Sequence, residues 1–170
     1  MLSDLSILPV ALSSRAGEVQ LRRAVPGDLP GLMALLSDDP ISAARGDRGD
    51  DSDEEAYAAA LRSVLNAPLN DLLVVDDAAG RLVGTLQLTV IPGMARRGAT
   101  RLLVEAVRVS STERSSGIGT AVMQWVMHVA APATGATLVQ LTSDAARVDA
   151  HRFYTRLGFV DSHVGFKYAV

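Results

Sequence analysis

The stretch that decides the fold is 113-ERSSGIGTAVMQWVM-127, in which a short polar loop with two glycines runs into a long apolar segment. The apolar side chains predict a helix that is buried on nearly all sides and that holds the loop still. Free amide N–H groups and the helix dipole at such an N-terminus form a site for an anion, and glycine lets the backbone approach it closely. Arg114 could add a charged fork to a phosphate. An ordinary strand-to-helix turn explains the same loop equally well.

Two nucleotide-binding patterns fit this loop less well. In a dinucleotide fingerprint, Val122 would stand at the third glycine and Asp144 would be the distant acid. A triphosphate-binding loop would need Gly-Lys-Ser/Thr, which does not follow here.

The residues on either side of the loop predict a mixed sheet with helices on both faces. Alternating or β-branched runs predict strands, and apolar residues at helical spacing predict helices. The expected strands are 18–24, a hairpin over 71–91, 101–109, 136–142 and 159–170, and the expected helices are 29–36, 54–66, 118–132 and 147–158. Three consecutive strands favour an antiparallel meander, and the later strand-helix-strand unit favours one parallel pair. The acidic segment 38–55 is expected to be a solvated connection, or else an acidic lip that attracts a cationic substrate.

Length and composition narrow the class of protein. The chain has 170 residues, is 48% hydrophobic and contains no Cys, so one core without disulfides or cysteine chemistry is expected. The net charge of -3 argues against non-specific nucleic-acid binding. Residues 1–17 are expected to be a loosely ordered extension and 18–170 a single domain. No segment is long and apolar enough to span a membrane, so a soluble, cytoplasmic protein is expected, and no metal-type spacing of histidines predicts a metal site.

Two segments taken together resemble the GNAT superfamily of acetyl-CoA-dependent N-acetyltransferases. These are VEAVRVSSTERSSGIG at 104–119 and DAHRFYTRLGF at 149–159. The resemblance covers roughly residues 18–170 and implies an α/β fold with a central mixed, mostly antiparallel sheet of about six to seven strands and about four helices. The ending AHRFYTRLGFVDSHVGFK looks like small-molecule members, including aminoalkylphosphonate N-acetyltransferases. It therefore favours a small amine as the substrate.

The resemblance also implies acetyl-CoA as the cofactor and a set of residues that hold it. Backbone groups of two strand residues would pair with the pantetheine arm, the loop would hold the pyrophosphate, and an arginine would stand where the family often has Asn. These residues are Val107, Val109, Arg114, Ser115, Ser116, Gly117, Ile118, Gly119, Thr120 and Arg147. The two serines replace a basic residue that is frequent in the family, and their hydroxyls can donate to phosphate.

Glu105 is the candidate base. An amine attacks only when it is neutral, and a lysine-like amine has a pKa of about 10.4, so a proton acceptor is needed at neutral pH. If the strand is regular, Glu105 shares a face with Val107 and Val109, and apolar neighbours raise its pKa. A solvent-facing glutamate at a bulge is the alternative.

Tyr154 is the candidate acid, because the resemblance places its hydroxyl near the departing thiolate. A core aromatic residue on the same helix face as Ala150, Phe153 and Leu157 is the alternative. The expected activity is direct transfer of an acetyl group to a primary amine. A non-catalytic acyl-CoA-binding domain and a protein lysine or N-terminal acetyltransferase are the alternatives, and a homodimer is possible.

Overall fold

The computed structural model describes residues 2, 5, 7–43, 46 and 49–170. The chain forms two compact units, Met1–Gln140 and Leu141–Val170. Because residues 44–45 and 47–48 are not among the described residues, part of the acidic segment expected over 38–55 lies outside them. In the part of the chain that is described, no helix combines the length and the apolar character needed to cross a bilayer.

The sheet has six strands, and their order in the sheet follows the chain. The four pairs from the first to the fifth strand are antiparallel. The Thr137 N–H donates to the Thr100 carbonyl at 3.0 Å and joins the starts of the last two strands. The predicted mixed, mostly antiparallel sheet is confirmed. Its strands are β1 (Val10–Ser14), β2 (Gly17–Arg23), β3 (Asn70–Asp76), β4 (Leu82–Ile91), β5 (Arg101–Val109) and β6 (Leu138–Leu141).

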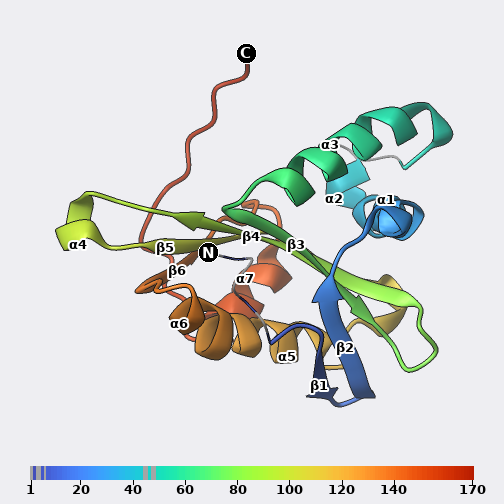
Figure 1. Cartoon of the computed structure of the whole chain (residues 1–170), viewed down its shortest axis with the longest axis horizontal. Helices are drawn as coiled ribbons and strands as arrows, with labels where there is room; N and C mark the ends of the chain where they lie inside the picture. The colour runs from blue at the N-terminus through green and yellow to red at the C-terminus, as the bar shows by residue number, and fades with distance from the viewer. Residues whose placement is uncertain (1, 3–4, 6, 44–45, 47–48) are drawn as a thin grey trace. The chain divides into compact units, whose positions relative to one another are not determined.

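Helices cover both faces of the sheet (Figure 1). On one face lie α1 (Leu29–Ser37), the short α2 (Pro40–Ala43) and α3 (Glu54–Asn66). On the other lies a continuous helical run composed of α5 (Ile118–Trp125), the π-helical η5 (Val126–Ala130) and α6 (Ala131–Ala133). The run is apolar on several sides, as predicted, and the main core lies between it and the sheet. The short α4 (Ala95–Gly98) lies in the connection between β4 and β5.

Side-chain alternation assigns the two faces of the sheet. Leu73, Leu86, Leu88, Leu102 and Val104 are at most 1% exposed and form the apolar face under α5. The opposite face packs against α1 and α3 through a smaller cluster. Its buried members are Ala24, Leu32, Leu61 and Val74.

The ends of the chain differ from the sequence-based expectation. The segment expected to be loosely ordered contributes β1, which pairs with β2 from Val10↔Leu21 to Ser14↔Gly17. Residues 159–170, all of which the structure describes, were expected to form a strand and form none. From Val160 onward their large apolar side chains are mostly exposed, as at Phe166 (93%) and Tyr168 (91%). Alternation alone does not satisfy backbone N–H and C=O groups, because a strand also needs a partner.

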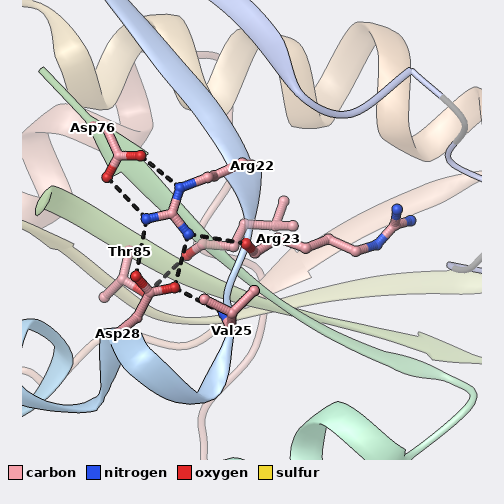
Figure 2. Close-up of polar contacts among 7 residues, drawn as sticks. Arg22, Arg23, Val25, Asp28, Asp76 and Thr85 are labelled. Carbon is pink, nitrogen blue, oxygen red and sulfur yellow. Dashed lines mark hydrogen bonds and ion pairs between the residues drawn. The ribbon is translucent and has the colours of Figure 1, made fainter. Parts of the chain in front are cut away.

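Arg22 in β2 fixes the start of α1 to the sheet (Figure 2). Its Nη1 and Nη2 donate to the Asp28 carboxylate at 2.7 and 2.9 Å, and its Nη2 donates to Asp76 of β3 at 3.2 Å. The Asp28 carboxylate also accepts the Val25 N–H at 2.7 Å. The side chains of Arg22, Asp28 and Asp76 are 26%, 11% and 12% exposed. The hydrogen bond from Arg22 holds the pKa of Asp28 below its usual range.

We expect Asp28→Ala to lower the free energy of unfolding by about 1–2 kcal/mol, because it leaves half-buried donors of Arg22 without their acceptors. Urea denaturation at neutral pH measures this change. Arg81→Ala is the control: it removes an exposed ion pair with Asp77 in the β3–β4 turn and should cost much less.

The pH dependence of the Asp28→Ala effect gives a second measurement. Because the folded-state pKa of Asp28 is lowered, its contribution is complete above the ordinary carboxyl pKa of about 3.9 and is lost as the pH falls through the folded-state value. The difference from wild type should therefore shrink at acidic pH. A difference that stays constant from pH 7 down to acid unfolding would contradict this assignment.

Candidate active site

The strand β5 has one residue more than the part of β4 that it faces. Thr85 pairs with Arg108 and Gln87 with Glu105, so two residues of β5 lie opposite a single residue of β4. This is a β-bulge, which bends a strand and re-aims its side chains. Ala106 within the bulge has a φ of 50°, in the left-handed region that a residue with a Cβ adopts only at a cost.

The bulge corrects the predicted placement of Glu105. A regular strand would have put Glu105 on one face with Val107 and Val109, but the extra residue breaks the alternation after Glu105. Glu105 is exposed, and its cross-strand partner is the polar Gln87. The geometry matches the alternative, a solvent-facing glutamate at a bulge, and the catalytic role of Glu105 stays a prediction.

A row of three hydrogen-bonded polar side chains lies beside Glu105. We call Asn70, Gln87 and Thr89 the polar row. The Gln87 Nε2 and the Thr89 Oγ1 both donate to the Asn70 Oδ1, at 3.0 and 2.7 Å. Gln87 is also the cross-strand partner of Glu105. Sequence reasoning missed this row, although polar residues do alternate with buried leucines along β4.

The candidate cofactor loop, residues 110–117, follows β5 directly and is tied to the end of α1. The Asp38 carboxylate accepts the Ser111 N–H at 2.6 Å. Arg114 donates from Nη2 to the Asp38 carbonyl at 3.4 Å, a long contact, and its side chain is exposed. The predicted contact of Arg114 with a phosphate stays a prediction.

The last residue of the loop, Gly117, stands at the N-terminus of α5. Gly117 is the N-cap residue with a φ of 90°, and the first α-helical hydrogen bond runs from Ala121 N–H to its carbonyl at 3.0 Å. The amides of Gly119 and Thr120 precede that bond and can face a ligand. The side chain of Ile118 is 1% exposed, so this residue could bind a ligand only through its backbone. The backbone N–H groups at this helix N-terminus are therefore suited to bind an anion.

Beyond the bulge, β5 continues further than its neighbour β6. Their starts are joined at Thr100 and Thr137, but β6 has four residues whereas β5 has nine. The half of β5 that carries Val107 and Val109 thus extends past the end of β6. An extended ligand could pair with backbone groups there.

The remaining predicted site residues lie in the second unit. Arg147 caps the N-terminus of α7 (Val148–Arg156) after a turn in which its N–H donates to the Asp144 carbonyl at 3.0 Å. Tyr154 is half-buried and packs edge-on against Phe153 and Phe159, with ring centroids 5.1 and 5.8 Å apart. This packing is what a core aromatic residue would show, and the roles of Arg147 and Tyr154 stay predictions.

A comparison with protein families decides the class of protein. The model of the acetyltransferase (GNAT) family matches residues 30–159, which include the bulge, the candidate cofactor loop and α7. The chain belongs to the GNAT acetyltransferase family. Among the curated proteins, none gives a significant match.

Solved structures agree with the GNAT fold. A transcriptional regulator from Bacillus halodurans C-125 is 35% identical, with a TM-score of 0.83 over 89% of this chain and 99% of that one. A putative acetyltransferase from Agrobacterium tumefaciens str. C58 is 27% identical, with a TM-score of 0.73 over 88% and 99%. A glucosamine-6-phosphate N-acetyltransferase from Arabidopsis thaliana is 17% identical, with a TM-score of 0.71 over 89% and 97%. The last likeness shows the fold alone.

We expect Gly117→Ala to lower the free energy of unfolding more than Gly80→Ala does. Both glycines have positive φ, 90° and 75°, so each alanine adds left-handed strain of about 1 kcal/mol. Only at Gly117 would the new Cβ also meet backbone, at 3.1 Å from the Arg15 nitrogen, whereas nothing lies within 4 Å at Gly80. Chemical denaturation of the two variants measures the difference, and equal losses would contradict a tight contact at Gly117.

Proposed function

We propose that this GNAT protein transfers an acetyl group from acetyl-CoA to a primary amine of a small molecule by direct attack on the thioester. The observation that carries the proposal is the continuity of residues 105–120. A carboxylate, a bulged strand edge and a glycine loop that opens a helix N-terminus follow one another along this stretch. This order suits a long ligand whose anionic group binds at the helix N-terminus, whose extended part lies along the strand edge and whose reactive end lies near the carboxylate.

In this proposal each part of the stretch binds one part of acetyl-CoA, which supplies the activated acetyl group. The amides of Gly119 and Thr120 and the dipole of α5 hold the pyrophosphate, with the hydroxyls of Ser115 and Ser116 as further donors. Backbone groups of Val107 and Val109 pair with the extended arm, and an N–H near Val107 polarises the thioester carbonyl. The family resemblance supports Arg114 as an additional contact, and Arg147, which stands where the family often has Asn, is proposed as a further contact in its place.

Glu105 takes the amine proton in the proposed reaction, directly or through a water molecule. The amine nitrogen forms a bond to the thioester carbon, the carbon–sulfur bond breaks, and the thiolate is protonated, for which Tyr154 is the proposed donor. The exposure of Glu105 supports a role as proton acceptor by position, since an incoming amine can reach it. The polar row beside it offers hydrogen-bonding groups to the same substrate.

The finer assignment of the substrate rests on short sequence features. The likeness of residues 150–167 to aminoalkylphosphonate N-acetyltransferases supports a small amine, and the acidic residues between α1 and α3 support a cationic one. A cytoplasmic location and a homodimer belong to the same proposal. Transfer to a protein lysine or N-terminus is the alternative for an enzyme.

A non-catalytic acyl-CoA-binding domain is the second candidate. It is favoured by the 35% identical structure, which is named a transcriptional regulator. Binding of acetyl-CoA without turnover on any amine would support this candidate against the enzyme.

Calorimetric titration with acetyl-CoA, with NAD and ATP as controls, tests the proposal. We expect saturable binding of acetyl-CoA alone, followed by release of free thiol when small primary amines are added. Absence of acetyl-CoA binding would refute both candidates, whereas binding of NAD in its place would point to a different class of nucleotide-binding protein.

We expect Glu105→Gln to lower the rate of acetyl transfer most at low pH and less at high pH. As the pH rises, a growing fraction of the amine is already neutral, so the base is needed less. The pH–rate profile of kcat/KM measures this effect. Glu18→Gln, which changes an exposed glutamate of β2, is the matched control and should leave the profile unchanged. A Glu105→Gln profile that coincides with wild type would exclude Glu105 as the base.

A further inference from the structure

The turn between β1 and β2 lies directly against the candidate cofactor loop. Arg15 donates from Nη2 to the Ser115 carbonyl at 2.9 Å, and the Ala16 N–H donates to the Ser116 carbonyl at 3.1 Å. Two consecutive carbonyls of the loop are therefore held by two consecutive residues of the turn. This hairpin precedes residues 30–159, the part of the chain that the family model matches.

The turn presents Arg15 in a defined position. The hairpin has only two residues between its strands, and its last pair is Ser14↔Gly17. The Ser14 Oγ donates to the Gly17 carbonyl at 2.7 Å and accepts the Ala16 N–H at 3.2 Å. Gly17 has a φ of 114°, a conformation that suits glycine. A turn fixed in this way limits where the backbone of Arg15 can lie.

The backbone conformation of the candidate cofactor loop allows the β1–β2 turn to lie close against it. Ser115 has a φ of 67°, a strained conformation for a residue with a Cβ, and its carbonyl is the one that Arg15 binds. A Cβ on Gly117 would lie 3.1 Å from the backbone nitrogen of Arg15 and 3.4 Å from its Nε. The Arg15 guanidinium group therefore stands next to the N-cap residue of α5.

Charge indicates why this contact matters for a ligand. Ser115 and Ser116 of the loop carry no charge, and Arg114 donates toward the Asp38 carbonyl at 3.4 Å. A guanidinium group has five N–H donors, so one of them can hold a carbonyl while others face a phosphate oxygen. Arg15 supplies a positive charge from outside the loop.

We propose that Arg15 is a positioning residue for the cofactor, which holds the Ser115–Ser116 backbone in its ligand-binding conformation and places a guanidinium group beside the pyrophosphate. This inference rests on the proposed function, because it requires that the loop bind CoA. It assigns to the N-terminal hairpin a role in ligand recognition as well as in the sheet.

Arg15→Ala tests the proposal by calorimetric titration with two ligands, CoA and pantetheine, the second of which lacks the pyrophosphate. We expect the Kd for CoA to rise about tenfold, as for the loss of a hydrogen bond to a charged group, and the Kd for pantetheine to stay unchanged. Arg15→Lys keeps the charge without the planar fork and should give an intermediate value. Arg62→Ala, which removes an exposed arginine from α3, is the control for overall charge and should bind CoA like wild type.

Each other result overturns the proposal for a separate reason. Wild-type affinity of Arg15→Ala for CoA would show that Arg15 takes no part in binding. Equal weakening of CoA and pantetheine binding would show a purely structural role, and equal weakening of CoA binding by Arg62→Ala would show only a general effect of charge.

If wild type itself does not bind CoA, the proposed function fails and this inference fails with it. If Arg15→Ala does not fold, Arg15→Lys decides, and wild-type affinity of that variant for both ligands then overturns the role of the planar fork in positioning.

Discussion

The uneven pairing of β4 with β5 is the constraint from which the candidate active site follows. The extra residue of the bulge, at Ala106, interrupts the alternation of side chains between the two faces of β5. The residues after the bulge therefore no longer share a face with Glu105 in the way that a regular strand would require. On the other face the fully buried residues Leu102 and Val104 precede the bulge, so the first half of β5 is anchored in the core. The left-handed conformation at Ala106 has an energetic cost, and the packed core beneath it stabilises that conformation.

Past the bulge, the chain is held by contacts from three separate elements. The Ser110 N–H donates to the Val83 carbonyl of β4 at 2.9 Å, and Asp38 holds the next residue from the end of α1. The turn between β1 and β2 then holds Ser115 and Ser116. Conformations with positive φ at Ser115 and Gly117 are maintained by these contacts and not by local sequence alone. Preorganised amides bind an anion without first having to be ordered.

Most of the fold could be predicted from local pattern, because hydrophobic periodicity reports directly on α1, α3, α5 and the central strands. The bulge could not, since register depends on how many residues the partner strand contributes. The strand β1 was missed because it is short, and because its apolar residues belong to a run that Pro9 interrupts. At 159–170 the alternating pattern predicts a strand, but the structure describes all of these residues and none of them is in a strand.

The candidate site likewise has parts that local sequence predicts and parts that depend on contacts between distant residues. The loop over 114–119 is visible as a motif, whereas the contact of Arg15 with Ser115 joins residues 100 positions apart and leaves no local signature. The polar row is intermediate: its strand residues are visible as polar positions in β4, but their convergence on Asn70 requires the β3–β4 register.

The strand order of the sheet bears on how the chain is assembled. Because the six strands follow one another in the sheet as they do in the chain, every new strand finds its partner in the strand made just before it. During synthesis the sheet can grow from one edge, and no strand has to be inserted between two that have already paired. Only the β2–β3 and β5–β6 connections require closing a long loop, and in both cases the intervening helices shorten the distance to be searched. The candidate cofactor loop, residues 110–117, lies in the last of these connections, so it follows all of β1 to β5 in the order of synthesis.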